Sequence, residues 1–294
     1  MNTPRFARIF VAASLTLALF STLSAQSTEA PKVTFPAPSP ASTLKQRVGL
    51  TDIEVIYSRP GVKGRQIFGG LEAYGKVWRT GANSATKIKF STPVKLNGTD
   101  IPAGSYELFT IPGADEWIVI IHKDSSEWGA YSYDAKNDIA RVKATPVKLA
   151  ESVETFTIDV NDIRNESATL NLIWEKTRVP VKLQVDVVSA VVPQIEAALA
   201  SPATKPAGFY FGAAQFYYDQ GLDLQKAKTL ITQATAGEKP AFYMVHLKAK
   251  ILAKLGEKDA AIAAAKQSTE LAVAVEGPQS GFVKMNNDLI ASLR

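Results

Sequence analysis

The hydrophobic pattern of this chain changes its period once, near Val188, and that change constrains the fold more than any other feature. Before it, apolar residues recur at every second position, as in 156–160, 169–174 and 181–187. Successive side chains of a strand point to opposite faces, so this period is typical of strands with one buried face. After Val188 the chain is rich in Ala, Leu, Lys and Gln at helical spacing. We therefore expect a β-domain followed by a helical domain.

The β-domain is predicted to span residues 43–188 and to form an antiparallel β-sandwich or barrel. Its apolar alternating segments are short, and no helical segment separates them, as is usual for these folds. Asn97-Gly98 predicts a tight hairpin turn, because a type I′ turn needs positive φ at both central residues. The run 117–121 is almost continuously apolar, which indicates a strand buried on both faces.

The helical domain is predicted over residues 189–294, with Pro193 at the start of its first helix. Expected helices cover 194–200, 207–220, 223–236, 240–255, 258–275 and 279–293. Ala214 and Gly221 recur 35 positions later as Ala249 and Gly256, a spacing that resembles degenerate tetratricopeptide repeats. An ordinary antiparallel bundle is the alternative, because the diagnostic Trp of that repeat is missing. Stacked helical hairpins offer a concave groove, so we expect a protein partner here.

The N-terminal residues 1–25 have the features of a secretion signal peptide. Arg5 and Arg8 precede an apolar run, 9–20, that is too short to span a bilayer as a helix; an uncleaved anchor is the alternative. Residues 26–42 contain four prolines and predict an extended leader. The chain has no cysteine and hence no lipid-anchor motif and no disulfide. We expect a periplasmic or secreted protein without a stable membrane anchor after signal cleavage.

The charge and the residue inventory disfavour several classes of function. The formal net charge of +5 falls to +3 without Arg5 and Arg8, because segment 1–25 holds no acid; we therefore expect no nucleic-acid partner. The two histidines, His122 and His246, fall in different predicted domains, so no metal and no cofactor are expected. We interpret His122 as a histidine at the end of a strand, with hydrogen-bond partners for its ring nitrogens inside the protein. Without a cysteine or a Gly-x-Ser-x-Gly motif, nucleophilic catalysis has little support.

A basic and aromatic stretch, residues 57–86, is the candidate ligand-binding region. It holds five cationic residues and a single acid, Glu72. Arg59, Arg65 and Arg79 alternate with aromatic residues, and this mixture suits an anionic or sugar-like small molecule. Guanidinium groups bind anions in a bidentate manner, and aromatic faces stack on rings. In the alternative interpretation, the arginines pair with carboxylates and tie long loops to the sheets.

Several spaced motifs are found in the β-domain. They are Tyr57-Ser-Arg-Pro-x-x-Lys-Gly-Arg65, Trp78-Arg-Thr-Gly-Ala-Asn83-x-x-Thr86, Ile101-Pro-Ala-Gly-Ser-Tyr-x-Leu-Phe109, Asp138-x-x-Arg141 and Leu172-x-Trp174-Glu. Over residues 39–187 the chain resembles the bacterial secreted family called domain of unknown function 2911. The resemblance implies an envelope protein with no assigned activity. It marks these residues as motif positions and ligand-binding candidates: Arg59, Arg65, Trp78, Arg79, Asn83, Thr86, Trp128, Tyr133, Asp138 and Arg141.

Two functions are compatible with these observations, and in a third interpretation the β-domain is purely structural and the helical region alone is functional. The first is a non-catalytic binding or scaffold protein, with a polar pocket lined by arginines and aromatic residues and a helical region that docks a partner. The second is a hydrolase that acts on a carbohydrate or another anionic envelope substrate. Its acid or base would be Asp138, Glu54 or Glu107, with a pKa adjusted by the arginines.

Overall fold

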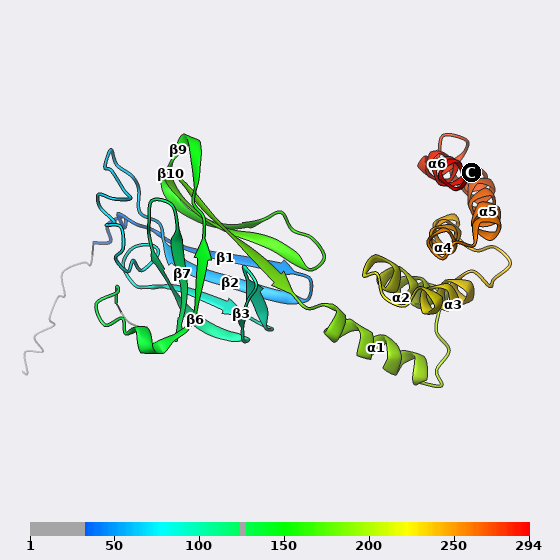
Figure 1. Ribbon diagram of the computed structural model, residues 1–294, viewed down its shortest axis with the longest axis horizontal. Coiled ribbons are helices and arrows are strands. Elements are labelled where there is room, and N and C mark those ends of the chain that lie inside the picture. The colour runs from blue at the N-terminus through cyan, green and yellow to red at the C-terminus, as the bar shows by residue number, and fades with distance from the viewer. Residues whose placement is uncertain (1–32, 124–127) are drawn as a thin grey trace, which may run out of the picture. The chain divides into compact units, whose positions relative to one another are not determined.

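The computed structural model describes residues 33–123 and 128–294, and in these ranges two antiparallel β-sheets precede six α-helices (Figure 1). This confirms the predicted layout of a β-domain followed by helices. The predicted signal peptide, 1–25, lies outside the described residues, as does the first part of the predicted leader. The first strand begins at Ala41, inside the segment 26–42 that was expected to be extended leader.

The strands form a six-stranded and a four-stranded sheet in the described part of the chain. The first sheet has the order β1-β2-β3-β6-β7-β8. The second has the order β5-β4-β10-β9. The two sheets do not close into one, so the architecture is the sandwich rather than the barrel. The bounds are β1 (Ala41–Val48), β2 (Thr51–Ser58), β3 (Thr86–Phe90), β4 (Val94–Leu96), β5 (Thr99–Ile101), β6 (Gly104–Ile111), β7 (Trp117–Lys123), β8 (Asp138–Ala144), β9 (Val147–Asn161) and β10 (Ser167–Val185).

The main core is a continuous cluster of apolar side chains drawn from both sheets and from the loop between β2 and β3. Five aromatic rings lie at its centre, and their centroids are 4.7 to 6.3 Å apart. Burying a side chain of this size stabilises the fold by roughly 1.5–3 kcal/mol. The five rings belong to Phe68, Trp78, Trp117, Phe156 and Trp174.

Two local predictions for the β-domain are confirmed. Asn97 and Gly98 connect β4 to β5 with φ angles of 43° and 85°, which few other residues adopt without strain. The Asn97 side chain also accepts a hydrogen bond from the backbone of Lys182 at 2.7 Å, so the turn is tied to β10. Strand β7 lies between β6 and β8, and its residues are largely buried on both faces, as the apolar run predicted.

Strand β10 joins two segments that the sequence pattern indicated separately. Its pairing with β9 ends at Arg178 and its pairing with β4 begins at Leu183. Pro180 falls between the two ladders, where its missing N–H removes no ladder hydrogen bond. An irregularity at Glu175, which has a φ of 52°, marks a bulge in the strand. β10 is therefore one continuous strand that pairs first with β9 and then with β4.

The first helix begins earlier than predicted, at Val188 rather than at residue 194. Asp186 accepts a hydrogen bond from the backbone N–H of Ser189 at 2.9 Å, which satisfies one of the free donors of the first turn. Pro193 therefore lies inside the first helix. The helices are α1 (Val188–Ala200), α2 (Ala207–Asp219), α3 (Leu224–Ala234), α4 (Phe242–Lys254), α5 (Lys258–Glu276) and α6 (Gly281–Leu293).

The later helices pack on one another in chain order, α2 on α3, α3 on α4, α4 on α5 and α5 on α6. Small residues such as Ala214, Ala249 and Ala265 are fully buried at these contacts, because they allow close approach of the helix backbones. Within the described residues, no helix combines the length and the hydropathy needed to cross a membrane.

A buried polar network joins three of the helices. His246 on α4 bonds through Nδ1 with Asn286 Oδ1 on α6 at 2.7 Å. Asn286 donates to the Ser268 hydroxyl on α5 at 3.0 Å, and Ser268 donates to the Phe242 carbonyl at 2.8 Å. Burial lowers the pKa of His246 below its ordinary value of 6.5. Protonation of this histidine is therefore opposed by the folded helices.

Acidification is expected to weaken the helical region through His246. A histidine whose pKa is lower in the folded state contributes stability that is present above about pH 6.5 and is lost as the pH falls. Far-UV circular dichroism should show a lower melting temperature at about pH 5 than at about pH 8. The variant His246→Gln keeps a polar side chain but cannot titrate, so part of this dependence should disappear. An unchanged pH dependence in the variant would contradict the prediction.

Candidate functional site

A row of ionisable side chains crosses the outer face of the six-stranded sheet. Lys87 on β3, Glu107 on β6, His122 on β7 and Asp138 on β8 are successive cross-strand neighbours, and such neighbours project from the same face. Glu107 is 1% exposed and His122 is 3% exposed. Burying ionisable groups costs several kcal/mol unless they are paired. This face therefore holds an interior polar network rather than an ordinary solvated surface.

Asp138 is the centre of this network. Its Oδ1 lies 2.9 Å from His122 Nδ1, and its Oδ2 accepts from the Tyr133 hydroxyl and from Arg141 Nε, both at 2.7 Å. Arg141 Nη2 also donates to the Tyr133 oxygen at 2.7 Å. Burial raises the pKa of Tyr133 to about 12, and the hydrogen bond to Asp138 adds to the rise. The four residues form one connected unit that holds Tyr133 neutral.

A second, smaller core explains why these polar groups are buried. Phe109 on β6 and Ile120 on β7 point away from the main core and are covered by Ala130 and Tyr133 of the β7–β8 connection. The Phe109 ring packs edge-on against His122 at 5.4 Å and against Tyr133 at 5.3 Å. The polar network and this apolar cluster together hold the connection against the sheet.

Arg79 reaches the same face from a different segment. Trp78 exchanges two backbone hydrogen bonds with Thr110 of β6, at 2.7 and 2.9 Å, and its side chain enters the main core. The neighbouring Arg79 therefore points outward, as alternation along an extended chain requires. Arg79 lines a pocket of about 260 Å³. Its other lining residues are Glu72, Val77, Trp78, Ala130 and Tyr131.

The Arg79 guanidinium has an unused hydrogen-bond donor. Its Nε is buried and has no hydrogen-bond partner in the described part of the chain. Gly129 lies close to it with a φ of 78°, and an added Cβ there would lie 3.1 Å from Arg79 Nη1 and 2.8 Å from the Tyr131 ring. Only glycine fits without displacing one of these groups. The approach of the 129–131 segment to Arg79 therefore shapes the pocket.

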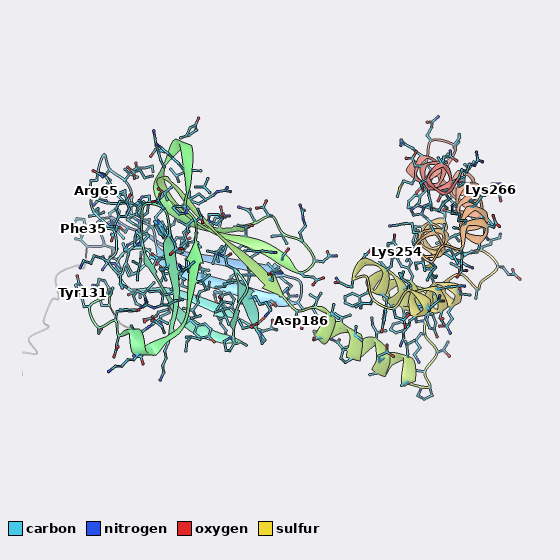
Figure 2. All side chains as sticks on the ribbon, in the orientation of Figure 1. Phe35, Arg65, Tyr131, Asp186, Lys254 and Lys266 are labelled. Atoms are coloured by element: carbon cyan, nitrogen blue, oxygen red, sulfur yellow. The ribbon has the colours of Figure 1, made fainter. Side chains whose placement is uncertain are left out.

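Exposed aromatic side chains accompany this pocket. Tyr131, which lines it, is 86% exposed, and the nearby Trp128 is 63% exposed. Figure 2 places Tyr131 and Arg65 at the same end of the β-domain. Large aromatic residues are mostly buried in proteins, and their exposure near an arginine pocket is a feature of surfaces that bind ligands.

Glu72 is the carboxyl group of the pocket. Burial raises its pKa to about 7, against the opposing attraction of Arg79 and Arg65. Within the residues that the structure describes, its carboxyl group makes no hydrogen bond and no ion pair. Its backbone is held by hydrogen bonds with Ile67 and Gly69, both at 2.9 Å. The pocket thus contains a carboxyl group and a guanidinium that form no direct ion pair in the described structure.

The structure separates the predicted arginines. Arg59 donates to the Phe156 carbonyl at 2.9 Å and to the Thr157 hydroxyl at 2.7 Å. Arg65 donates to two carbonyls of its own loop, at 3.0 and 2.7 Å. These two arginines tie loops in place, but through carbonyl and hydroxyl oxygens rather than the carboxylates of the alternative interpretation. Of the three, Arg79 has the buried Nε without a partner.

Three further candidates support the backbone that carries Arg79. Trp78 lies in the core and donates from Nε1 to the Gly81 carbonyl at 3.1 Å. Asn83, with a φ of 60°, donates to the Ser58 hydroxyl at 3.2 Å. The Thr86 hydroxyl donates to the Thr80 carbonyl at 2.6 Å. Their hydrogen bonds therefore fix the loop.

The remaining candidates fall at the pocket rim or in the Asp138 network. Trp128 lies exposed on the connection that passes the pocket, while Tyr133, Asp138 and Arg141 bond to one another. Sequence reasoning did not select His122 or Glu72 as site residues. Glu72 carried a visible signal, because it is the single acid in a basic segment. His122 carried none, since its pairing with Asp138 depends on strand register.

The carboxylates considered for a hydrolase are engaged or buried. Glu54 forms an ion pair with Lys45 at 3.1 Å, and Asp138 forms one with Arg141 at 2.7 Å. Glu107 lies within the buried row. No group of three or more potential metal-ligating side chains gathers among the described residues.

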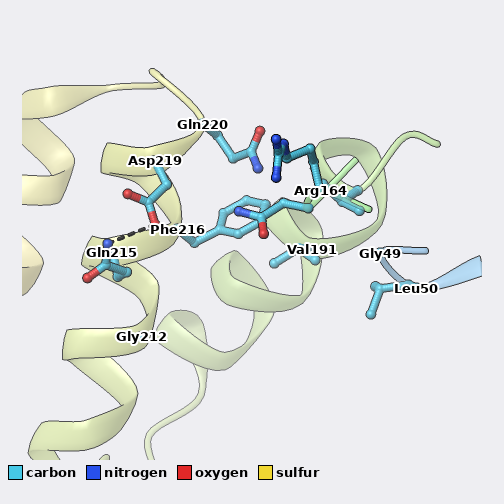
Figure 3. Close-up of a pocket in the computed structure, with 11 residues that line it drawn as sticks. Gly49, Leu50, Arg164, Val191, Gly212, Gln215, Phe216, Asp219 and Gln220 are labelled. Atoms are coloured by element: carbon cyan, nitrogen blue, oxygen red, sulfur yellow. Dashed lines mark hydrogen bonds between the residues drawn. The ribbon is translucent and has the colours of Figure 1, made fainter. Parts of the chain in front are cut away.

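A second pocket, of about 500 Å³, contains none of the family-motif residues (Figure 3). Its Asp219 carboxylate accepts a hydrogen bond from Gln215 at 2.7 Å. The residues that line it are Gly49, Leu50, Arg164, Asn165, Val187, Val191, Gly212, Gln215, Phe216, Asp219 and Gln220.

Comparison with known families agrees with the motif resemblance. The family model described as Protein of unknown function (DUF2911) matches residues 39–183, a range that contains every motif residue named above. A search of curated proteins and a search of solved structures found no match. The matched range runs from just before β1 almost to the end of β10. Over residues 39–183 the chain is therefore similar to the family described as Protein of unknown function (DUF2911).

Proposed function

We propose that the β-domain binds an anionic ligand, with the chemistry of an acidic carbohydrate, in the pocket at Arg79. The observation that carries the proposal is the buried, unpartnered Nε of a guanidinium that lines a pocket of about 260 Å³. Leaving such a donor unsatisfied costs about 1–3 kcal/mol. A ligand carboxylate would accept this hydrogen bond together with one from a terminal nitrogen of the same group.

The aromatic residues favour a carbohydrate over a small inorganic anion. Tyr131 lines the pocket, and Trp128 lies three residues before it on the same connection, both with most of their side-chain surface in solvent. Aromatic faces of this kind stack on the apolar faces of sugar rings, while guanidinium binds the acidic group. A uronate-containing oligosaccharide combines both features.

The proposal includes export from the cytoplasm, because residues 1–25 carry the charged and apolar regions of a signal peptide. The protein partner predicted for the helical region stays a prediction. Such a partner would cover large apolar side chains that are exposed in the described structure of α4 to α6, which are Tyr243, Val273, Val275 and Met285. The hydrolase alternative has less support, because Glu54 and Asp138 are held in ion pairs.

Replacing Arg79 with Met should weaken binding of a glucuronate-containing oligosaccharide at least tenfold, because hydrogen bonds to a charged group contribute about 1.5–3 kcal/mol. Isothermal titration calorimetry on the full chain would measure the loss. The matched control is Arg47→Met, which removes an exposed arginine that pairs with Asp52 on the first two strands. Equal affinity in Arg79→Met and wild type would contradict the proposed site. Equal binding of a neutral oligosaccharide would contradict the proposed ligand class.

A further inference from the structure

We infer that Glu72 is a second recognition residue of this pocket, and that the ligand carboxylate binds together with one proton, which it shares with the Glu72 carboxyl group. This inference rests on the proposed function and adds to it the charge state of the ligand and a pH dependence of binding. The ligand class is a carboxylate that accepts one hydrogen bond from a carboxylic acid and two from a guanidinium.

The positions of Glu72 and Arg79 allow Glu72 to contact a ligand that is bound to Arg79. Glu72 and Arg79 line the same pocket, yet no ion pair joins them in the described structure. A direct ion pair would have occupied one edge of the guanidinium and left fewer of its five N–H donors for a ligand. Backbone hydrogen bonds from Glu72 N–H to the Ile67 carbonyl and from Gly69 N–H to the Glu72 carbonyl hold this residue in place. Both recognition groups are therefore presented by ordered backbone.

The charges around Glu72 act in opposite directions. Arg79 and Arg65 favour its ionised form, burial disfavours it, and burial is the larger effect, so the pKa rises to about 7. Tyr131 is the other titratable side chain that lines the pocket. A protonated Glu72 leaves the Arg79 charge uncompensated and adds an O–H donor. An ionised Glu72 repels a ligand carboxylate and competes with it for Arg79.

Ligand binding and protonation should therefore assist each other. Two carboxylates that share one site cannot both remain charged without cost, so the pKa of the pair rises on binding. Above about pH 7, the affinity should fall by up to about tenfold for each further pH unit, because a proton must be taken up. Below about pH 6 it should level off, since Glu72 is already protonated in the free protein.

The test uses the full chain and a glucuronate-containing oligosaccharide in isothermal titration calorimetry. Titrations at about pH 6 and about pH 8, each in two buffers of different ionisation enthalpy, report the affinity and the number of protons taken up. We expect about one proton at the higher pH and few at the lower pH. The variant Glu72→Gln retains a donor but cannot titrate, so its affinity should be independent of pH and without proton uptake.

Asp52→Asn is the matched control, because it neutralises an exposed acid on β2 that pairs with Arg47; it should retain the wild-type pH dependence. The Glu72→Gln variant is expected to fold. A carboxyl group whose pKa is raised on folding contributes stability at acid pH and loses it as the pH rises through about 7. Near-UV circular dichroism would check the fold.

The outcomes separate this inference from the proposed function. Binding that is lost in Arg79→Met but shows no proton uptake in wild type would overturn the role of Glu72 and leave the Arg79 site standing. A wild-type pH dependence retained in Glu72→Gln would also overturn it. Absence of wild-type binding at both pH values would overturn the proposed function and the inference with it.

Discussion

Replacing Asp138 with Ala is expected to lower the free energy of unfolding of the β-domain by about 3–5 kcal/mol, because it breaks a buried charged network. The Asp138 carboxylate is bonded to His122, Tyr133 and Arg141, at 2.9, 2.7 and 2.7 Å. Its removal would leave the buried His122 Nδ1 and the Tyr133 hydroxyl without their acceptor, and the Arg141 charge without its partner. The β7–β8 connection would also lose its main polar attachment to the sheet.

Urea unfolding followed by tryptophan fluorescence would measure this loss, because all four tryptophans lie in the β-domain. Asp52→Ala is the matched control: Asp52 also forms a 2.7 Å ion pair, with Arg47, but both side chains are mostly exposed, so its loss should destabilise the domain far less than the loss of Asp138. Asp138→Asn keeps one acceptor oxygen and should lie between the two. Equal effects of Asp138→Ala and Asp52→Ala would show that the network contributes little.

Replacing Trp78 with Ala should destabilise the β-domain by about 3–5 kcal/mol, through lost burial and the cavity that remains. The Trp78 ring stacks on Trp174 with centroids 5.8 Å apart and packs edge-on against Phe68 and Phe156. Its indole N–H also donates to the Gly81 carbonyl at 3.1 Å. A smaller side chain would therefore disturb both the core and the loop that begins at Arg79.

Trp128→Ala provides the contrast, because both tryptophans belong to the family motifs but Trp128 is 63% exposed. Its unfolding free energy should change by no more than about 0.5 kcal/mol. Its affinity for an acidic oligosaccharide should fall, since Trp128 belongs to the proposed aromatic rim. A stability loss in Trp128→Ala as large as that in Trp78→Ala would contradict this division between core and rim.

The Asp138 network also holds in place the chain segment that lines the Arg79 pocket. Tyr133 of that network follows Ala130 and Tyr131, which line the Arg79 pocket, and its N–H donates to the Ala130 carbonyl. A family motif residue can thus serve the proposed site without touching a ligand. Asp138, Tyr133 and Arg141 are positioning residues in this sense, and Arg79 and Glu72 are the recognition residues.

The sequence by itself determined the elements that arise from local chemistry. Period-two alternation located the strands, because side chains of a strand alternate between faces. Asn97-Gly98 located a turn, since these residues accept positive φ. Helical spacing located most of α2 to α6 to within a few residues. The sequence places the start of α1 too late, because a proline is typical of a first turn. In the structure Pro193 lies inside the helix, and Asp186 accepts a hydrogen bond from Ser189 in the first turn.

Only the tertiary structure decided which arginine is available to a ligand. In the sequence, Arg59, Arg65 and Arg79 are alike: each is a cation near an aromatic residue in a glycine-rich stretch. Their partners depend on loop conformation and on which strand lies alongside, and neither is encoded by residue spacing. The fold gives Arg59 and Arg65 protein acceptors. It leaves Arg79 Nε buried, unpartnered in the described structure and beside Glu72, because those two residues converge through separate turns of the chain.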